Sequence, residues 1–492
     1  MNALERALTR APVVPGLASS SPVAGLNRRT LGFADVVAQS VSATAPVAAA
    51  TTMPALVVGV AGGASNGSTM LVSLAFAAAL TLLTAGSINQ FTKRIASTGS
   101  LYTFTVRGLG IVPGLSAGVA LLIGYAFVSM FSLAGVALYA TQLLGGVLPQ
   151  AGVIAALLVA GCALGALLLG VKVSARIVLV VELIAVAIVL VFFVIVLLQG
   201  SPSLVLFHFD PFVDGPGPIV VGTALAVTAF VGFESSASLA VETRRPLARV
   251  PRAITSTVLA AGVLYLIAGS AQVTGFATLG ESLGDATSPV NTLAARFGSP
   301  FPGPVLDAAV IASFFACALA STTALVRVLF TMSREGVLPR SCGRVHPRRL
   351  TPHLATLAAV PTVAAVPIIA LLAGAAPWHL MQVLILVAAA GYLTAYVLCC
   401  AAVPAFLTRI GERTTRATVQ AIAAALLLAT CLVAYLVVES QGERAVGVVV
   451  FAGLLTAGVI WTRFLTRRSL AKAIGIYDEP VHADVHSSGT SE

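Results

Sequence analysis

Two carboxylates stand inside long apolar stretches of the sequence, where they could exchange a proton or pair with a cation. Glu182 lies in "VVELIAVAIV" and Glu234 lies in "FVGFESS". A charged side chain at the centre of a membrane costs about 2.5–3.5 kcal/mol on an insertion scale. Burial favours the neutral carboxylic acid, so both residues are candidates for proton exchange. The alternative for each is a structural hydrogen bond between neighbouring helices.

Two segments could expose backbone groups to a small molecule. The segment 42–45, Ser-Ala-Thr-Ala, precedes Pro46, which removes a backbone donor and clashes with the preceding helical turn. Gly232 weakens the second segment two residues before Glu234. An interrupted helix presents amides to an anion at one end of the break and carbonyls to a cation at the other. A zwitterion would satisfy both, whereas a simple Pro kink is the structural alternative at Pro46.

The composition predicts the elements that must position these groups. The chain has 492 residues, of which 58% are hydrophobic and 9% are charged, and its mean hydropathy is +1.00. Soluble domains carry about 25% charged residues. The apolar runs are continuous over about 20 residues and do not alternate, which predicts spanning helices rather than barrel strands. We therefore expect an all-α polytopic membrane protein embedded in the lipid bilayer.

Twelve transmembrane helices are predicted, and an even number places both termini on the same side. The spans cover residues 33–62, 69–90, 112–142, 150–170, 176–199, 218–241, 252–276, 305–331, 354–374, 379–406, 417–438 and 444–463. Lys and Arg are enriched in cytoplasmic loops. With a cytoplasmic N-terminus, all 28 Lys and Arg residues except Arg296 and Arg444 fall in cytoplasmic segments. The sequence thus predicts a multi-pass protein of the cytoplasmic membrane with both termini cytoplasmic.

Several partners are not expected. The net charge of +10 comes from loop residues between apolar spans, so it is not a signal for nucleic acid. The six cysteines show no metal-ligand spacing, and we expect neither a metal nor a cofactor.

The two interrupted spans occupy corresponding places in the chain. Span 1 begins one group of five helices and span 6 begins the next, and because five is odd the two groups enter the membrane from opposite sides. This predicts a 5+5 inverted-repeat core with broken helices 1 and 6, and such paired breaks point to a transport site near mid-membrane. The expected divisions are a disordered cytoplasmic tail 1–27, a core 28–408 with repeats 33–199 and 218–406, helices 11 and 12 in 409–463, and a cytoplasmic tail 464–492.

Three motifs carry a family resemblance. "GFESSASLAVETRRPLARVPRAI" (232–254), "STGSLYTFTVRGLG" (97–110) and "LFTMSREGVLP" (329–339) occur in the order found in the amino acid–polyamine–organocation (APC) superfamily. The chain thus resembles its permeases, of the bacterial amino acid permease type. The resemblance implies the LeuT-like ten-helix fold of this superfamily, plus helices 11 and 12. The chain departs from the family in helix 1, where "SATAPVAAA" replaces the glycine-rich break of many members.

The resemblance implies a substrate site between the two breaks. The carbonyls would come from Ser42, Ala43, Thr44 and Ala45, the amides from Val47 and Ala48, and further acceptors for an ammonium group from Phe230, Val231 and Gly232. Phe230 or Phe233 would cover the site as an aromatic gate, with lipid or core contact as the alternative for either ring. Glu234 would fix the broken helix, bind the amino group or exchange a proton.

The family resemblance also implies roles in ion coupling and gating. Glu182 and Glu234 are the candidates for proton coupling, while Ser321 and Thr322 could contribute hydroxyls to a less favoured sodium site. Ordinary helix packing is the alternative for both hydroxyls. Glu242, Arg244 and Arg245 are expected to serve topology and an inner gate, with Glu242 paired to a loop arginine such as Arg94 or Arg107.

These features together favour a secondary active transporter of amino acids or related amines, working by alternating access as a proton-coupled symporter or exchanger. An amine carrier of the polyamine or ethanolamine type is the alternative substrate class. The sequence lacks a Gly-X-X-X-X-Gly-Lys-Ser/Thr motif, a filter loop and an intramembrane His/Asp/Glu constellation, which argues against a nucleotide-driven pump, a channel or sensor, and an enzyme.

Overall fold

The structure is a computed structural model of the whole chain. It describes residues 21–60, 67–144, 147–148, 150–200, 216–286, 288–297, 303–442, 444–466 and 474–479. Most of the two predicted tails, 1–27 and 464–492, therefore lies outside the described residues. Within the first tail, Val23 and Leu26 are buried against the bundle.

Twelve apolar segments of the described chain are long enough to cross a membrane, which confirms the predicted number. The uninterrupted spans are α4 (Gly67–Thr92), α6 (Ile111–Leu144), α7 (Ala151–Leu169), α8 (Val171–Gln199), α11 (Pro246–Leu279), α13 (Gly303–Arg334), α14 (His353–Leu372), α15 (Pro377–Arg409), α16 (Thr415–Ser440) and α17 (Ala445–Thr466). Span 1 consists of α2 (Phe33–Ala43) and α3 (Pro46–Val60), and span 6 consists of α10 (Pro216–Val227), η1 (Thr228–Phe230) and η2 (Ser235–Glu242). The short connecting helices are α5 (Leu101–Leu109), η3 (Leu283–Asp285), α12 (Pro289–Phe297) and η4 (Arg340–Gly343).

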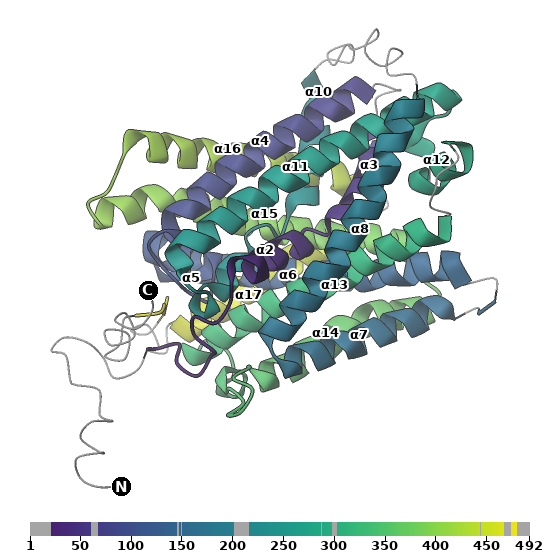
Figure 1. Cartoon of the computed structure of the whole chain (residues 1–492). Coiled ribbons are helices and arrows are strands. Elements are labelled where there is room, and N and C mark those ends of the chain that lie inside the picture. Colours follow the sequence, from purple (N-terminus) through teal and green to yellow (C-terminus); the bar gives the residue numbers. More distant parts are fainter. Residues whose placement is uncertain are drawn as a thin grey trace, which may run out of the picture.

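The helices α6, α13 and α15 form the centre of the bundle, where α6 packs against both of the others (Figure 1). Glycines let α6 and α15 approach closely. A Cβ on Gly391 would lie 2.7 Å from the Ala120 carbonyl oxygen, and one on Gly124 would lie 2.9 Å from the Tyr392 ring. Small residues have this role in membrane bundles because they bring backbones into contact. The result is a close-packed support beside the two interrupted spans.

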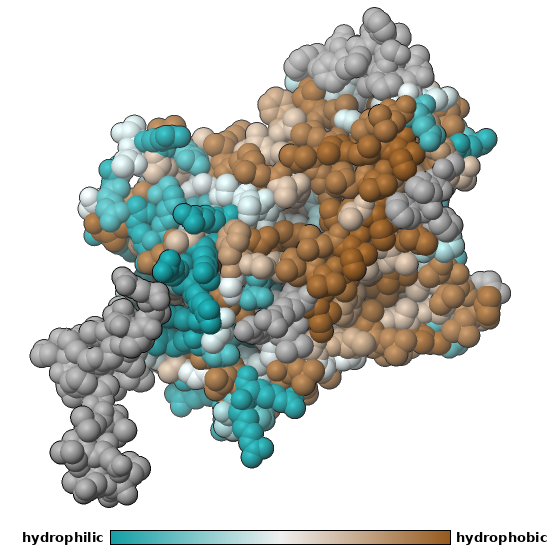
Figure 2. All heavy atoms as spheres, in the orientation of Figure 1, coloured by the Kyte–Doolittle hydropathy of each residue, from teal (hydrophilic) through white to brown (hydrophobic). Residues whose placement is uncertain are grey.

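Figure 2 shows apolar side chains over the middle of the molecule and hydrophilic side chains gathered at one end. Large apolar residues are exposed along α8, α11, α14 and α16, as expected for surfaces that contact lipid. The hydrophilic end carries Arg94, Arg107, Arg244, Arg334 and Arg409, and is termed the arginine-rich face below. The all-helical fold with broken helices 1 and 6 is thus confirmed.

Candidate functional site

The break in span 1 falls at the predicted place. The first half-helix, α2, ends at Ala43, and Thr44 caps it by donating its hydroxyl to the Val41 carbonyl at 2.7 Å. Ala45 then takes a left-handed conformation with φ 46°, and α3 begins at Pro46. Proline suits the first helical position because its missing N–H would have no intrahelical partner. The break therefore interrupts the run of helical backbone hydrogen bonds between the end of α2 and the start of α3.

The break in span 6 is built around Gly232. The α-helix ends at Val227, and the chain continues through the short helix η1 and a turn into η2. Gly232 has φ +94°, a conformation that residues with a Cβ rarely adopt. Its amide is bonded to the phenol oxygen of Tyr396 in α15 at 3.1 Å, so a side chain replaces a lost helical partner.

The two breaks touch each other. A Cβ on Gly232 would lie 2.6 Å from the Ala43 carbonyl oxygen, closer than real side chains come to a backbone atom. The same oxygen accepts a hydrogen bond from the Cys317 thiol of α13 at 3.4 Å. Glycine at position 232 is thus required both by its dihedral angle and by the contact between the two opened backbones.

A small central cavity of about 20 Å³ lies between the breaks. Five of the predicted substrate-binding residues line it, namely Ala43, Thr44, Ala45, Ala48 and Val231. The other lining residues are Ala49, Thr52 and Met53 of α3, Val128 and Phe131 of α6, Thr228 and Ala229 of span 6, Cys317 of α13 and Ile385 of α15. None of these lining side chains is an acid, a lysine, an arginine or a histidine. The central cavity is therefore apolar apart from hydroxyls and opened backbone.

Glu234 does not line the central cavity, although it is fully buried beside it. Tyr125 of α6 donates its hydroxyl to one carboxylate oxygen at 2.9 Å, and Tyr396 of α15 donates to the other. Two phenols on separate helices thus hold the residue that follows the break. In this conformation the arrangement suits a carboxylate that anchors span 6 to α6 and α15.

The two predicted aromatic residues pack behind the break. The Phe230 ring meets the Tyr265 ring edge-on with centroids 4.9 Å apart, and Tyr265 donates its hydroxyl to the Ala229 carbonyl at 2.8 Å. Phe233 lies 5.3 Å from the Tyr396 ring. Neither phenylalanine lines the central cavity in this conformation.

Glu182 lies on the other side of the span 1 break. Ser313 of α13 donates its hydroxyl to Oε1 at 2.9 Å, and the Val47 amide at the start of α3 also interacts with this carboxylate. Its other oxygen, Oε2, has no hydrogen-bond partner among the described residues. Glu182 and Ser42 both line a second cavity between α2, α8 and α11 rather than the central one.

The predicted hydroxyls of α13 are engaged away from the carbonyls of span 1. Thr322 donates to the Ser129 hydroxyl of α6 at 3.1 Å, and Ser321 lies 3.8 Å from the Cys317 sulfur. In the described residues, the α13 side chain that reaches a carbonyl at the break is that of Cys317. A thiol is a soft group and does not favour an alkali cation.

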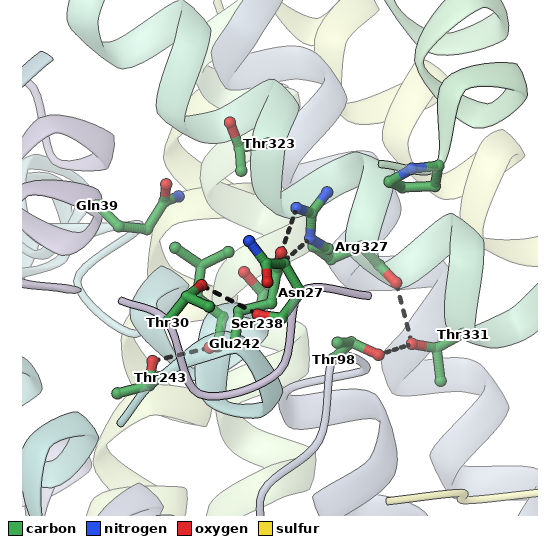
Figure 3. Close-up of polar contacts among 12 residues, drawn as sticks. Asn27, Thr30, Gln39, Thr98, Ser238, Glu242, Thr243, Thr323, Arg327 and Thr331 are labelled. Atoms are coloured by element: carbon green, nitrogen blue, oxygen red, sulfur yellow. Dashed lines mark hydrogen bonds and ion pairs between the residues drawn. The ribbon is translucent and has the colours of Figure 1, made fainter. Parts of the chain in front are cut away.

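A buried ion pair joins η2 to α13 (Figure 3). Arg327 of α13 donates through Nε and Nη2 to the two oxygens of Glu242 at 2.8 and 3.3 Å, and both side chains are nearly inaccessible. Beside the pair, Thr98 and Thr331 share a hydrogen bond of 2.7 Å. These contacts join η2, α13 and the segment after α4, and are termed the inner gate.

The expected partner of Glu242 was wrong. Arg94 instead pairs with Glu412 at 2.7 Å, and Arg107 donates to the Gly475 carbonyl at 2.9 Å. The helix α13 continues to Arg334, so Arg327 lies inside the bundle opposite Glu242. A buried guanidinium with two donors matches a carboxylate better than an exposed loop residue would.

Arg244 and Arg245 lie at the surface just beyond the inner gate. The Arg244 amide donates to the Leu31 carbonyl at 3.0 Å, which completes a short parallel bridge between Leu31 and Thr243. Arg245 precedes α11 with φ 50°. The structure thus places both residues at the connection between η2 and α11, where the bridge holds the start of α2.

Sequence reasoning missed Tyr125, Tyr396 and Arg327. A tyrosine in the middle of an apolar span needs a partner for its hydroxyl, so both tyrosines could have been matched to Glu234. Arg327 lies inside the predicted span 305–331, so its charge within an apolar run could have been matched to a buried acid such as Glu242.

Comparisons with known proteins agree with this architecture. The sequence profile of the family described as Amino acid permease matches residues 48–459, more than half of the chain. The branched-chain amino acid permease BcaP of Bacillus subtilis (strain 168) is 27% identical over 313 residues, which span 60% of this chain and 66% of that protein. The low-affinity putrescine importer PlaP of Escherichia coli (strain K12) is 25% identical over 334 residues, or 66% and 72% of the two chains.

The fold also matches a solved structure. The crystal structure of MhsT in complex with L-phenylalanine superposes with a TM-score of 0.56 at 16% identity, over 83% of this chain and 99% of that one. At this identity the likeness concerns the fold alone. The proteins matched by sequence are permeases and importers by name and not enzymes, as the sequence analysis expected.

The contact between the breaks gives a first prediction. Gly232→Ala should lower the free energy of unfolding by about 1–3 kcal/mol because alanine is strained in this backbone conformation. The contact between the new Cβ and the Ala43 oxygen should add to this loss. Chemical unfolding of the purified protein measures this change. Gly161→Ala on α7, where a Cβ meets nothing within 4 Å, is the matched control. Equal stability of the two variants would contradict the account of the break.

The inner gate gives a second prediction. Arg327→Met leaves Glu242 buried without its cation, which typically costs about 3–5 kcal/mol. We expect a lower unfolding free energy and greater labelling of a cysteine behind the gate. Arg340→Met, at an exposed site just beyond the same helix, should change neither. If Arg327→Met is as stable and as closed as this control, the pair does not form the gate.

Proposed function

Because the chain belongs to the amino acid permease family, we propose that it is a secondary active transporter that carries small neutral amino acids across the cell membrane by alternating access. The observation that carries this proposal is the lining of the central cavity. It combines opened backbone at both breaks with apolar side chains and hydroxyls, and none of its lining side chains is an acid or a base.

The opened backbone suits the two charged ends of an amino acid. The Ala48 amide, in the first turn of α3, lies at a helix N-terminus beside the central cavity and favours a carboxylate, whereas the predicted Val47 amide already interacts with Glu182. The carbonyl of Ala43 and those around Val231 favour an ammonium group. A helix break therefore binds a zwitterion without any charged side chain, which is consistent with the composition of the cavity.

At about 20 Å³ the central cavity holds about one water molecule, so it has to widen to take a substrate, and its remaining lining then contacts the substrate side chain. Met53, Val128 and Ile385 offer apolar contacts, while Thr52 and Thr228 offer hydroxyls. A diamine would need an acceptor for its second ammonium group, and the nearest buried acid, Glu234, already receives two tyrosine hydroxyls. These features favour a neutral aliphatic amino acid over an amine of the polyamine type, although one relative is named a putrescine importer.

Glu182 is the better of the two candidates for proton coupling. One of its oxygens is bonded to Ser313, and the other is unpartnered and lines a cavity. Glu234 is held on both sides by tyrosines, which suits a structural anchor. The hydroxyls of Ser321 and Thr322 bond elsewhere, so the described contacts favour a proton over sodium as the coupled ion.

The orientation follows from the loop charges. We propose that the arginine-rich face is cytoplasmic, as the distribution of Lys and Arg predicts, and that both termini lie there. The inner gate then closes the path to the cytoplasm in this conformation. Residues 28–408 would form the transport core, with repeats 33–199 and 218–406, and residues 409–463 would add two peripheral helices.

Uptake into proteoliposomes tests the substrate and the coupling ion. A neutral aliphatic amino acid such as leucine should accumulate when the outside is acidic, without sodium, and putrescine should not compete. Accumulation of putrescine instead would move the assignment to an amine carrier. Failure of every amino acid and amine would leave the proposal without support.

A variant separates coupling from binding. Glu182→Gln should abolish proton-driven accumulation because it cannot ionise, while exchange of labelled for unlabelled substrate persists. Asp307→Asn, at another buried intramembrane acid, is the matched control and should retain both activities. Normal accumulation by Glu182→Gln would exclude this residue as the coupling site.

A further inference from the structure

A second cavity of about 270 Å³ lies between α2, α8 and α11. Its walls are mainly apolar and include Val41, Leu179, Val186 and Leu264. Leu183, another wall residue, is 59% exposed on the outer surface of the bundle, so the cavity lies close to the lipid. This amphipathic cavity is separate from the central one, because the two share only Thr44 of the span 1 break.

Three residues that line the amphipathic cavity each carry a buried oxygen with no partner in the described structure. The oxygens are Oγ of Ser42, Oγ1 of Thr257 and Oε2 of Glu182, and each of these residues is at most 2% exposed. They come from three different helices. Buried polar atoms are normally satisfied, so three in one cavity point to a missing partner.

The hydroxyl of Thr257 differs from its neighbours on α11. Thr255 donates to the Pro251 carbonyl and Ser256 to the Ala253 carbonyl, each at 3.0 Å, as hydroxyls within helices commonly do. Thr257 makes no such bond to its own helix. Its hydroxyl is therefore available to an occupant of the amphipathic cavity.

The oxygens and the walls together define the chemistry of an occupant. A carboxylate in apolar surroundings takes up a proton unless a positive charge lies beside it, and the buried Arg327 is already paired with Glu242. An ammonium group has three donors, which equals the number of unpartnered oxygens. An aliphatic chain suits the Val and Leu walls, whereas the carboxylate of an amino acid would be repelled by Glu182.

We propose that the amphipathic cavity is a second binding site, which takes a small aliphatic amine with its ammonium group on Glu182, Ser42 and Thr257. The site is distinct from the proposed substrate site and does not depend on which amino acid is carried. An amine bound there contacts α2 together with α8 and α11, so it holds the first half-helix in place. It also occupies the carboxylate that the proposed coupling uses, and so inhibits transport without displacing substrate.

Thermal unfolding of the purified protein with n-butylamine and n-hexylamine tests the site. Both amines should raise the melting temperature, n-hexylamine more than n-butylamine, while n-hexanol should have little effect. Glu182→Gln should lose the shift. Thr257→Val should weaken the apparent Kd about tenfold, as expected for one lost hydrogen bond to a charged group.

Two further variants locate the bound amine. Ala261→Leu fills the amphipathic cavity and should remove the shift, whereas Val263→Phe, which is exposed on the same helix, should retain it. Absence of any shift in the unmodified protein would mean that water alone satisfies the three oxygens, and would overturn the proposal. So would a shift that survives in both Glu182→Gln and Ala261→Leu, or one that saturating substrate abolishes. Failed transport with intact amine binding would count against the proposed function alone.

A different set of contacts supports a second inference, about residues 474–479, here termed the tail segment. The amides of Gly475 and Ile476 donate to Oε1 of Glu335 at 2.7 and 2.8 Å, just beyond α13. Arg107 lies over the Tyr477 ring, with its guanidinium carbon 4.5 Å from the centroid. The tail segment is thus fastened to α13 and α5 at the arginine-rich face.

The other end of the tail segment reaches the start of span 1. Asp478 forms an ion pair with Arg28 at 2.8 Å and accepts the Ser21 hydroxyl at 2.8 Å. Next to Arg28, the amides of Thr30 and Leu31 donate to the Glu242 carbonyl at 2.8 and 2.9 Å. The tail segment therefore connects residues 28–31, which bond to η2, to the helix that carries Arg327.

We infer that the tail segment is a clamp that favours the closed inner gate. Opening the arginine-rich face has to separate η2 and the start of α2 from α13, and the contacts of Asp478 and Glu335 oppose that separation. Releasing the clamp increases the fraction of molecules open at this face. This inference rests on the gate and not on the identity of the substrate.

Labelling of Ser238→Cys, a buried position on η2, measures the opening. In a background with the incompletely buried Cys162 and Cys342 replaced by Ser, Asp478→Asn and deletion of residues 474–492 should each raise the labelling rate severalfold. Glu479→Gln, at the exposed neighbouring position, should not. Unchanged labelling in both clamp variants, or slower labelling in either, would overturn the inference.

Discussion

The contact between Gly232 and the Ala43 carbonyl is the constraint on which the site depends. A helix opened inside a membrane loses backbone hydrogen bonds that no water can replace, so the freed groups need partners from protein. Here the two breaks lie against each other, and Cys317 and Tyr396 supply side-chain partners. Neighbouring protein groups thus stabilise both opened backbones, and the remaining amides and carbonyls lie beside one small cavity.

Three of the buried carboxylates are satisfied in three different ways, which indicates a division of roles. Glu234 receives two tyrosine hydroxyls and joins span 6 to the central helices. Glu242 is paired with Arg327 and joins η2 to α13. Glu182 has one oxygen bonded and one unpartnered in a cavity, so it alone of the three retains capacity for a proton or an ammonium group.

The fold was largely predictable because its signals are local. Continuous apolar runs locate the twelve spans, and Pro46 and Gly232 mark where spans 1 and 6 open. Their corresponding positions predict the inverted repeat. The ends of the spans were less certain, since α13 continues to Arg334, beyond the predicted end at residue 331.

The site was predictable only in outline, because side-chain partners come from distant parts of the chain. Tyr125 and Tyr396 reach Glu234 from helices that lie 109 and 162 residues away in sequence. Ser42 of α2 lines the amphipathic cavity, whereas its neighbour Ala43 lines the central cavity. No local pattern specifies which of two adjacent cavities a residue faces.

An experimental structure with a bound neutral amino acid would test the central claim most directly. The account predicts that the ligand carboxylate lies within hydrogen-bonding distance of the Ala48 amide. Its ammonium group should lie near the carbonyls of Ala43 and Val231, with Glu234 still bonded to its two tyrosines. A ligand whose ammonium group is paired with Glu234, or one bound outside the two breaks, would contradict it.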